Sequence, residues 1–161
     1  MIGVTIESWI CQVFSCFEGE SRAKICRMAT RILIVDDERT IADTLSVIFR
    51  AAGYETYTAY NGVLGLDAAR RVTPRLVLSD VVMPELDGVR MAMQIRQSMP
   101  ETAVLLFSGQ AGNADLLEGA EKKGYHFELL EKPMAPADLL RKVGQAISKF
   151  EESHPVARRP Q

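Results

Sequence analysis

Polar residues able to bind metals or react with phosphate follow several short apolar runs of the chain. They are Asp36-Asp37-Glu38, Asp80, Ser108-Gly109 and Glu131-Lys132-Pro133. Carboxylates that are brought together repel one another, and some of them take up a proton unless a cation lies between them. Magnesium prefers oxygen ligands, and it typically takes one or two carboxylates while it keeps several waters. The residue types therefore predict a cation and phosphoryl site, in which Mg²⁺ and Lys132 balance the charges of the aspartates.

Each of these residues also has an ordinary structural explanation when it is taken alone. A serine at a strand end commonly caps a turn, a Lys-Pro pair commonly forms a solvated turn, and an aspartate after a strand commonly caps a loop. Their occurrence together, in this order and after separate strands, favours a functional site.

The elements that must position these residues are apolar runs that alternate with amphipathic stretches from Met28 onward, which is the pattern of βα units. The predicted strands cover residues 32–35, 54–59, 76–79, 103–107 and 127–130. Four are largely apolar, as strands buried on both faces of a parallel sheet are. The second, YETYTA, alternates between apolar and polar residues and predicts an edge strand.

Five helices are predicted between and after these strands. Apolar residues at helical spacing mark the first and the last helix; they are Ile41, Leu45, Ile48 and Phe49, followed by a stop at Gly53, and then Leu139, Leu140, Val143, Ala146, Ile147 and Phe150 after Pro136. Asp87-Gly88 and Asn113 can start two more helices, and Gly124 can end one that carries Lys122 and Lys123 in its last turn.

Right-handed crossovers with helices on both faces predict an α/β fold with a doubly wound, five-stranded parallel sheet of the flavodoxin-like order 2-1-3-4-5. The first and third strands are then neighbours at the switch point of the sheet. Ligands of such sheets bind outside the carboxyl ends of the strands. The polar residues described above follow those ends.

Length and composition agree with one domain plus tails, since the chain has 161 residues. It is 47% hydrophobic and 25% charged with a net charge of −2, which gives no electrostatic footprint for nucleic acid. No apolar stretch approaches the roughly 20 residues of a membrane-spanning helix. Because every cysteine precedes residue 27, the predicted core has no disulfide and we expect a reducing, cytoplasmic location.

The motifs LIVDDE, LSDVVMPELDG, LLFSG and LLEKP, in this order and at these separations, resemble the receiver domain of two-component response regulators. The resemblance covers about residues 30 to 150. It implies that Asp80 is the phosphoacceptor, that Ser108 is the switch hydroxyl and that Lys132 is the invariant lysine of the family. It also implies that Mg²⁺ is held by Asp36, Asp37, Asp80 and the main-chain carbonyl of Val82.

By this resemblance the protein is a phosphorylation-dependent signalling switch rather than an enzyme. A sensor histidine kinase or a phosphotransfer protein supplies the phosphoryl group, and a downstream target protein reads the changed surface. The bond between Lys132 and Pro133 is commonly cis in receivers, and we predict a cis bond here.

Two positions depart from the usual receiver pattern. Receivers carry an aromatic residue three positions before the lysine, where this chain has Leu129; Phe127 is a candidate substitute. Val82 and Gln110 lie beside the site, and an apolar Val82 cannot position water by hydrogen bonding. We therefore expect a phosphoryl group that lasts for minutes or longer, with at most slow autodephosphorylation.

The predicted domain covers residues 28–150, and the segments on either side of it carry weaker signals. In residues 1–27 an apolar stripe at helical spacing predicts either a short amphipathic helix or a disordered extension, and translation can also start at Met28. Residues 151–161 are expected to be a flexible tail, which would make the protein a stand-alone receiver without an output domain.

Functions of other classes stay open on the sequence alone. A phosphorylation-independent scaffold with a receiver fold is one alternative, because of Leu129. An aspartyl phosphatase is another, although Val82 stands where a general acid would be needed. A flavin-binding protein of the same fold is a third, although no Ser/Thr/Gly-rich phosphate loop follows Val35.

Overall fold

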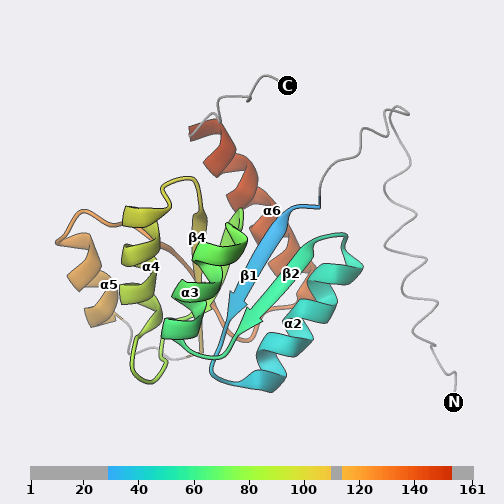
Figure 1. Cartoon of the computed structure of the whole chain (residues 1–161), viewed down its shortest axis with the longest axis horizontal. Helices are drawn as coiled ribbons and strands as arrows, with labels where there is room; N and C mark the ends of the chain where they lie inside the picture. Colours follow the sequence, from blue (N-terminus) through green and yellow to red (C-terminus); the bar gives the residue numbers. More distant parts are fainter. Residues whose placement is uncertain (1–28, 110–113, 154–161) are drawn as a thin grey trace, which may run out of the picture.

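A five-stranded parallel sheet forms the centre of the computed structural model, which describes residues 29–109 and 114–153 (Figure 1). Its strands are β1 (Arg31–Val35), β2 (Glu55–Ala59), β3 (Leu76–Asp80), β4 (Ala103–Ser108) and β5 (Glu128–Glu131). They are ordered β2-β1-β3-β4-β5, and every neighbouring pair is parallel. The predicted fold class and strand order are confirmed, and β2 is an edge strand as its alternating sequence indicated.

Five helices in the described residues cover the two faces of this sheet. They are α2 (Arg39–Ala51), α3 (Gly62–Val72), α4 (Gly88–Ser98), α5 (Ala114–Glu121) and α6 (Pro136–Ser153). Helices α3, α4 and α5 lie on one face, and α2 and α6 lie on the other (Figure 1). The structure is therefore a doubly wound α/β fold.

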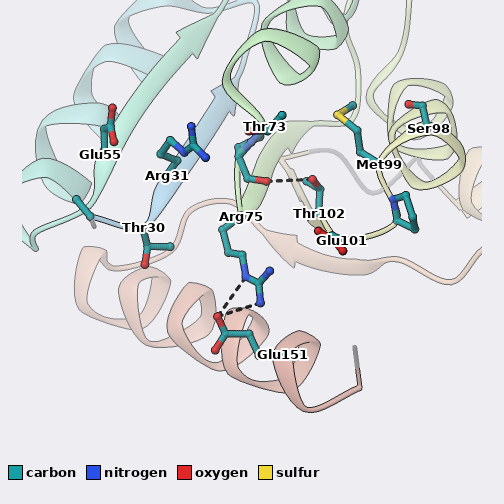
Figure 2. Close-up of a pocket in the computed structure, with 13 residues that line it drawn as sticks. Thr30, Arg31, Glu55, Thr73, Arg75, Ser98, Met99, Glu101, Thr102 and Glu151 are labelled. Carbon is teal, nitrogen blue, oxygen red and sulfur yellow. Dashed lines mark hydrogen bonds and ion pairs between the residues drawn. The ribbon is translucent and has the colours of Figure 1, made fainter. Parts of the chain in front are cut away.

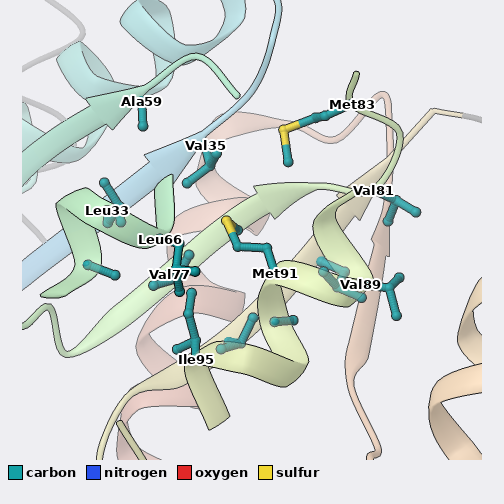
Figure 3. Close-up of a cluster of buried hydrophobic side chains, with 14 of the residues drawn as sticks. Leu33, Val35, Ala59, Leu66, Val77, Val81, Met83, Val89, Met91 and Ile95 are labelled. Atoms are coloured by element: carbon teal, nitrogen blue, oxygen red, sulfur yellow. The ribbon is translucent and has the colours of Figure 1, made fainter. Parts of the chain in front are cut away.

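Alternation along the strands builds a separate hydrophobic core on each face of the sheet. Leu33 and Val35 of β1 pack toward α3 and α4, where Met91 and Ile95 are fully buried (Figure 3). The intervening side chains of β1 pack instead with α2 and α6. Because side chains of a strand alternate between its faces, largely apolar runs are what a sheet covered on both sides requires.

Local signals in the sequence set most of the element ends. The Asp87 side chain caps α4 by accepting a hydrogen bond of 2.8 Å from the Arg90 N–H. Gly53 and Gly124 have φ of 91° and 84°, the left-handed conformation expected of a stop after a helix. One expectation is wrong in detail, since α5 ends at Glu121 and both Lys122 and Lys123 lie in the turn that follows.

Several sequence-based expectations fall outside the described residues. These are the amphipathic segment and the cysteines of residues 1–27, the helix start at Asn113, Gln110 beside the site, and residues 154–161 of the expected tail. At the other end α6 continues to Ser153, past the expected end of the domain at Phe150. Within the described part of the chain, no helix is both long and apolar enough to cross a membrane.

Candidate functional site

Two aspartates meet at the switch point of the sheet, where β1 and β3 are neighbours. Val35 is paired with Ser79 in the parallel register, so Asp36 and Asp80 follow at the same level of the two strands. Asp36 is 3% exposed, and the Asp80 side chain is 12% exposed. The strand register therefore places two nearly buried carboxyl groups side by side.

Lys132 joins these two carboxyl groups. Its Nζ lies 2.8 Å from Asp36 Oδ2 and 2.9 Å from Asp80 Oδ1. The residue follows β5 directly, and its main-chain N–H donates a 2.7 Å hydrogen bond to the carbonyl oxygen of Ser108 at the end of β4. The bond between Lys132 and Pro133 is cis, as predicted.

The second oxygen of each carboxyl group accepts a main-chain hydrogen bond. The Glu38 N–H donates to Asp36 Oδ1 at 2.9 Å, and the Val82 N–H donates to Asp80 Oδ2 at 3.0 Å. In both cases the donor lies two residues after the aspartate. The loops that follow β1 and β3 thus fix the orientation of both side chains.

The predicted site residues line one cavity of about 430 Å³ outside the carboxyl ends of the strands. Its lining consists of Asp36, Asp37, Glu38, Ile41, Asp80, Val82, Ser108, Gly109 and Lys132. Asp37 and Val82 are exposed, whereas Ser108 is buried at 5% exposure. Every residue predicted for catalysis or metal binding therefore lies at this cavity.

The pKa values of Asp80 and Lys132 are shifted by burial as well as by the charges of their neighbours. Burial raises the pKa of Asp80, and the nearby Asp36 adds to this effect, while hydrogen bonding and charge from Lys132 oppose it. Burial alone would lower the pKa of Lys132, but its contacts with Asp36 and Asp80 raise that pKa overall. One ammonium thus remains charged between two carboxyl groups and does not fully compensate both of them.

The donor set at this cavity fits a hard divalent cation bound with few protein ligands. The cavity lining holds two nearly buried carboxyl groups and the exposed Asp37 but a single ammonium group, which leaves negative charge uncompensated. The described residues contain no group of three or more His, Cys, Asp or Glu side chains already arranged around a metal position. Magnesium commonly keeps several waters and takes one or two carboxylates, so such an enclosed group is not required.

Gly88 lets the loop after β3 close against Asp80. A Cβ atom at this position would lie 1.9 Å from the Asp80 carbonyl oxygen. The Gly88 N–H donates a 2.8 Å hydrogen bond to the Val81 carbonyl, and earlier in the loop Glu85 has a φ of 67°. The Asp87-Gly88 pair therefore starts α4 and also holds the loop that carries Val82.

Leu129 occupies the position where an aromatic residue was expected from the receiver pattern. It is partly buried and pairs with Leu106 of β4. The Phe127 ring stacks on Tyr125 instead, with ring centroids 6.2 Å apart and an angle of 3° between the planes. The Tyr125 hydroxyl accepts a 2.7 Å hydrogen bond from Gln97 of α4. A switching role of Phe127 stays a prediction.

Phe107 contacts the site although no sequence pattern indicated this contact. The Lys132 Nζ lies over its ring, 5.1 Å from the ring centroid. Phe107 immediately precedes Ser108 in LLFSG, but alternate residues of a strand point to opposite faces, so this position did not indicate a contact with Lys132.

A second cavity lies at the opposite, amino end of the sheet (Figure 2). It is larger, at about 930 Å³, and none of the predicted site residues lines it. Arg75 forms an ion pair with Glu151 of α6 at 3.1 Å, and the buried Thr102 hydroxyl donates to the Pro74 carbonyl at 3.0 Å. These groups have structural partners across the cavity.

Comparison with known proteins gives one family and a consistent set of structures. Residues 32–144 match the model of the response regulator receiver domain. A CheY-like receiver domain protein from Methanospirillum hungatei JF-1 superposes with a TM-score of 0.71 at 26% identity, over 78% of this chain and 98% of that one. A receiver domain protein from Clostridium thermocellum gives a TM-score of 0.68 at 30% identity, over 76% and 98%.

Curated relatives include two longer regulators. The alkaline phosphatase synthesis transcriptional regulatory protein PhoP of Bacillus subtilis is 29% identical over 80% of this chain and 52% of its own length. The DNA-binding response regulator MtrA of Mycobacterium leprae is 29% identical over 72% of this chain and 50% of its own length. The chain thus spans about half the length of these relatives.

Proposed function

Because the chain belongs to the family of response regulator receiver domains, we propose that it is a phosphorylation-dependent switch of a two-component system, with Asp80 as its phosphoacceptor. The observation that carries this proposal is the meeting of Asp36, Asp80 and Lys132 at one cavity, with ion-pair distances of 2.8 and 2.9 Å. The phosphoryl donor would be a phosphohistidine on a sensor histidine kinase or on a phosphotransfer protein.

The transfer itself needs positioning and charge stabilisation rather than complex covalent chemistry. A carboxylate oxygen of Asp80 forms the new bond to phosphorus, while the bond from phosphorus to the donor histidine nitrogen breaks and its electron pair stays on that nitrogen. Asp80 is held for this attack because its carboxyl group accepts the Val82 N–H. Lys132 can turn its ammonium group from the Asp80 carboxylate to the oxygens of the transferring group.

Asp36, Asp37, Asp80 and the main-chain carbonyl of Val82 would hold Mg²⁺ at this cavity. When bound, the ion would supply the positive charge that compensates these carboxylates, and it would orient oxygens of the phosphoryl group. The raised pKa of Asp80 supports this assignment, since burial and Asp36 leave its carboxylate short of compensating charge.

Ser108 and Lys132 would carry the signal away from Asp80. Once Asp80 bears a phosphoryl group, the Ser108 hydroxyl can donate a hydrogen bond to it and Lys132 can pair with it. The two residues end β4 and follow β5, so these contacts would draw the ends of both strands toward the site. A downstream target protein would recognise the changed surface, and the reaction would take place in the cytoplasm.

The phosphorylated form should persist, which makes the protein a phosphoacceptor rather than an enzyme. Val82 is 43% exposed at the mouth of the cavity and offers an apolar side chain there. Such a side chain cannot orient an attacking water by hydrogen bonding. Release of phosphate within seconds would contradict this part of the proposal.

Intact-mass measurement after incubation with Mg²⁺ and acetyl phosphate tests the proposed function. The wild type should gain one phosphoryl group, and Asp80→Asn should gain none. Asp67→Asn is the matched control, because Asp67 is an exposed carboxylate of α3 paired only locally with Arg71, and it should label like the wild type. A wild type that stays unlabelled would contradict the proposal and favour the phosphorylation-independent scaffold.

A further inference from the structure

The ammonium group of Lys132 has a third partner besides the two carboxylates. Its Nζ lies 5.1 Å from the centroid of the Phe107 ring. A cation within about 6 Å of a ring centroid is attracted by the electron-rich face of the ring, and the attraction grows where water is excluded. Phe107 is 6% exposed and the Lys132 side chain is 18% exposed, so this contact is largely shielded from solvent.

The position of the Phe107 ring is fixed by the core rather than by Lys132. The side chain packs in the core between the sheet and helices α2 and α6, and the residue pairs with Leu130 across β4 and β5. Lys132 is held beside the same strand because its N–H donates to the Ser108 carbonyl. The ring is therefore packed in place independently of the Lys132 side chain.

The three partners of the ammonium group differ in what they can do with a metal ion. Asp36 and Asp80 present oxygens, which a hard cation prefers, whereas an aromatic ring offers none. When a divalent cation draws on the carboxylate oxygens, Lys132 loses part of its binding there. The ring is the one of the three partners that the cation does not compete for.

We infer that Phe107 is a positioning residue that keeps the Lys132 ammonium group in the cavity while Asp36 and Asp80 exchange it for a divalent cation. The inference rests on the proposed function for its biological meaning, but its first consequence concerns metal binding alone. In the metal-free protein the two carboxylates hold the ammonium group beside the ring, so the ring contributes a larger share of its binding once the carboxylates hold a cation. Without the ring the displaced ammonium group loses this contact, so the exchange is less favourable and Mg²⁺ binds more weakly.

A second consequence concerns phosphorylation. With Phe107 in place, Lys132 stays close enough to pair with an incoming phosphoryl group on Asp80. Loss of the ring should therefore lower the rate constant for labelling at saturating Mg²⁺ and saturating donor. A change that only loosened the core would alter unfolding without a specific effect on the metal.

Titration calorimetry with MgCl₂ alone is the primary test, because it needs no phosphoryl donor. Phe107→Leu removes the ring but keeps a buried apolar side chain, and its dissociation constant for Mg²⁺ should rise about three- to tenfold. Phe107→Tyr keeps the ring and should bind Mg²⁺ like the wild type. Leu105→Val is the matched packing control, since Leu105 lies on the same face of β4 at 2% exposure.

The urea midpoint of each variant, measured without Mg²⁺, separates a packing defect from the proposed role. We expect Leu105→Val to lose stability with unchanged Mg²⁺ affinity. An unchanged or tighter Mg²⁺ affinity in folded Phe107→Leu, or an equal loss in Leu105→Val, would overturn the role of Phe107. The proposed function would instead be overturned if the wild type stayed unlabelled while the Mg²⁺ affinities of the variants followed the expected order.

Discussion

The two ends of the sheet differ in how their charges are arranged. At the amino end a cavity of about 930 Å³ is lined by charged side chains such as Arg75, which pairs with the half-exposed Glu151. At the carboxyl end a cavity of about 430 Å³ holds two nearly buried carboxyl groups that share one ammonium group. The uncompensated buried charge thus lies at the smaller cavity, which is the one proposed as the phosphorylation site.

The largest difference between the two ends should appear when the positively charged side chain at each end is replaced by an uncharged one. Lys132→Met leaves two buried carboxylates without a counter-charge, and we expect a loss of about 3 kcal/mol in unfolding free energy at pH 7 without metal. Arg75→Met breaks a more exposed pair and should cost less than about 1 kcal/mol. Urea denaturation of both variants measures this; similar losses would show that the two ends are electrostatically alike.

Added Mg²⁺ should stabilise the protein through the carboxyl end only. At a free concentration one hundred times the dissociation constant, binding to the folded state adds about 2.7 kcal/mol. We expect this gain in the wild type and in Arg75→Met, and a much smaller gain in Asp80→Asn. Thermal unfolding with MgCl₂ or with EDTA gives the comparison, and an equal gain in Asp80→Asn would place the metal elsewhere.

Backbone substitutions should also affect the two ends differently. Gly88→Ala forces a Cβ atom against the Asp80 carbonyl, so we expect a loss of about 2 kcal/mol and slower labelling of Asp80. At the amino end Thr73 has a φ of 44°, and Thr73→Gly relieves that conformation. This variant should gain less than about 1 kcal/mol and label normally. Normal stability and labelling of Gly88→Ala would contradict the close approach.

The smallest expected effect is the pH dependence of Asp80 in the metal-free protein. Burial raises the pKa of this carboxyl group in the folded state, so the folded protein binds its proton more tightly than the unfolded chain does. Ionised Asp80 therefore lowers stability at neutral pH, and this cost disappears as the pH falls through the raised pKa. Asp80→Asn should therefore be more stable than the wild type at pH 7 in the absence of metal.

Urea denaturation of both proteins between pH 7 and pH 3 checks the sign of this effect. The advantage of Asp80→Asn should shrink steadily as the pH is lowered. An advantage that grew on acidification would mean that Asp80 is better stabilised as a carboxylate in the folded protein than in the unfolded chain.

Local sequence patterns were sufficient to predict the carboxyl end of the sheet. Asp36, Asp80 and Ser108 each end an apolar run, and parallel strands bring such ends to one edge. The cap at Asp87 and the left-handed glycine at Gly53 are also local, since a side-chain oxygen and a missing Cβ act on their own backbone.

Features that depend on contacts between distant segments were not predictable in this way. The amino-end cavity joins Thr73, Thr102 and Glu151, which are brought together only by the folded helices and strands. The contact of Phe107 with Lys132 depends on the path of the chain after β5, which no periodicity encodes. Lysines favour the last turn of a helix but do not fix its end. After α5 the Lys123 and Gly124 N–H groups donate to the carbonyls of Ala120 and Glu121, which closes a tighter turn.

The most direct test of the central claim is to identify chemically which residue carries the phosphoryl group. Acetyl phosphate and Mg²⁺ should convert Asp80 into an acyl phosphate, which borohydride reduces to homoserine, and peptide mass mapping then reads the position of that residue. We predict homoserine at position 80 and at no other aspartate of the carboxyl end. Homoserine at Asp36 or Asp37, or a stable phosphoryl group on another residue with position 80 unchanged, would contradict it.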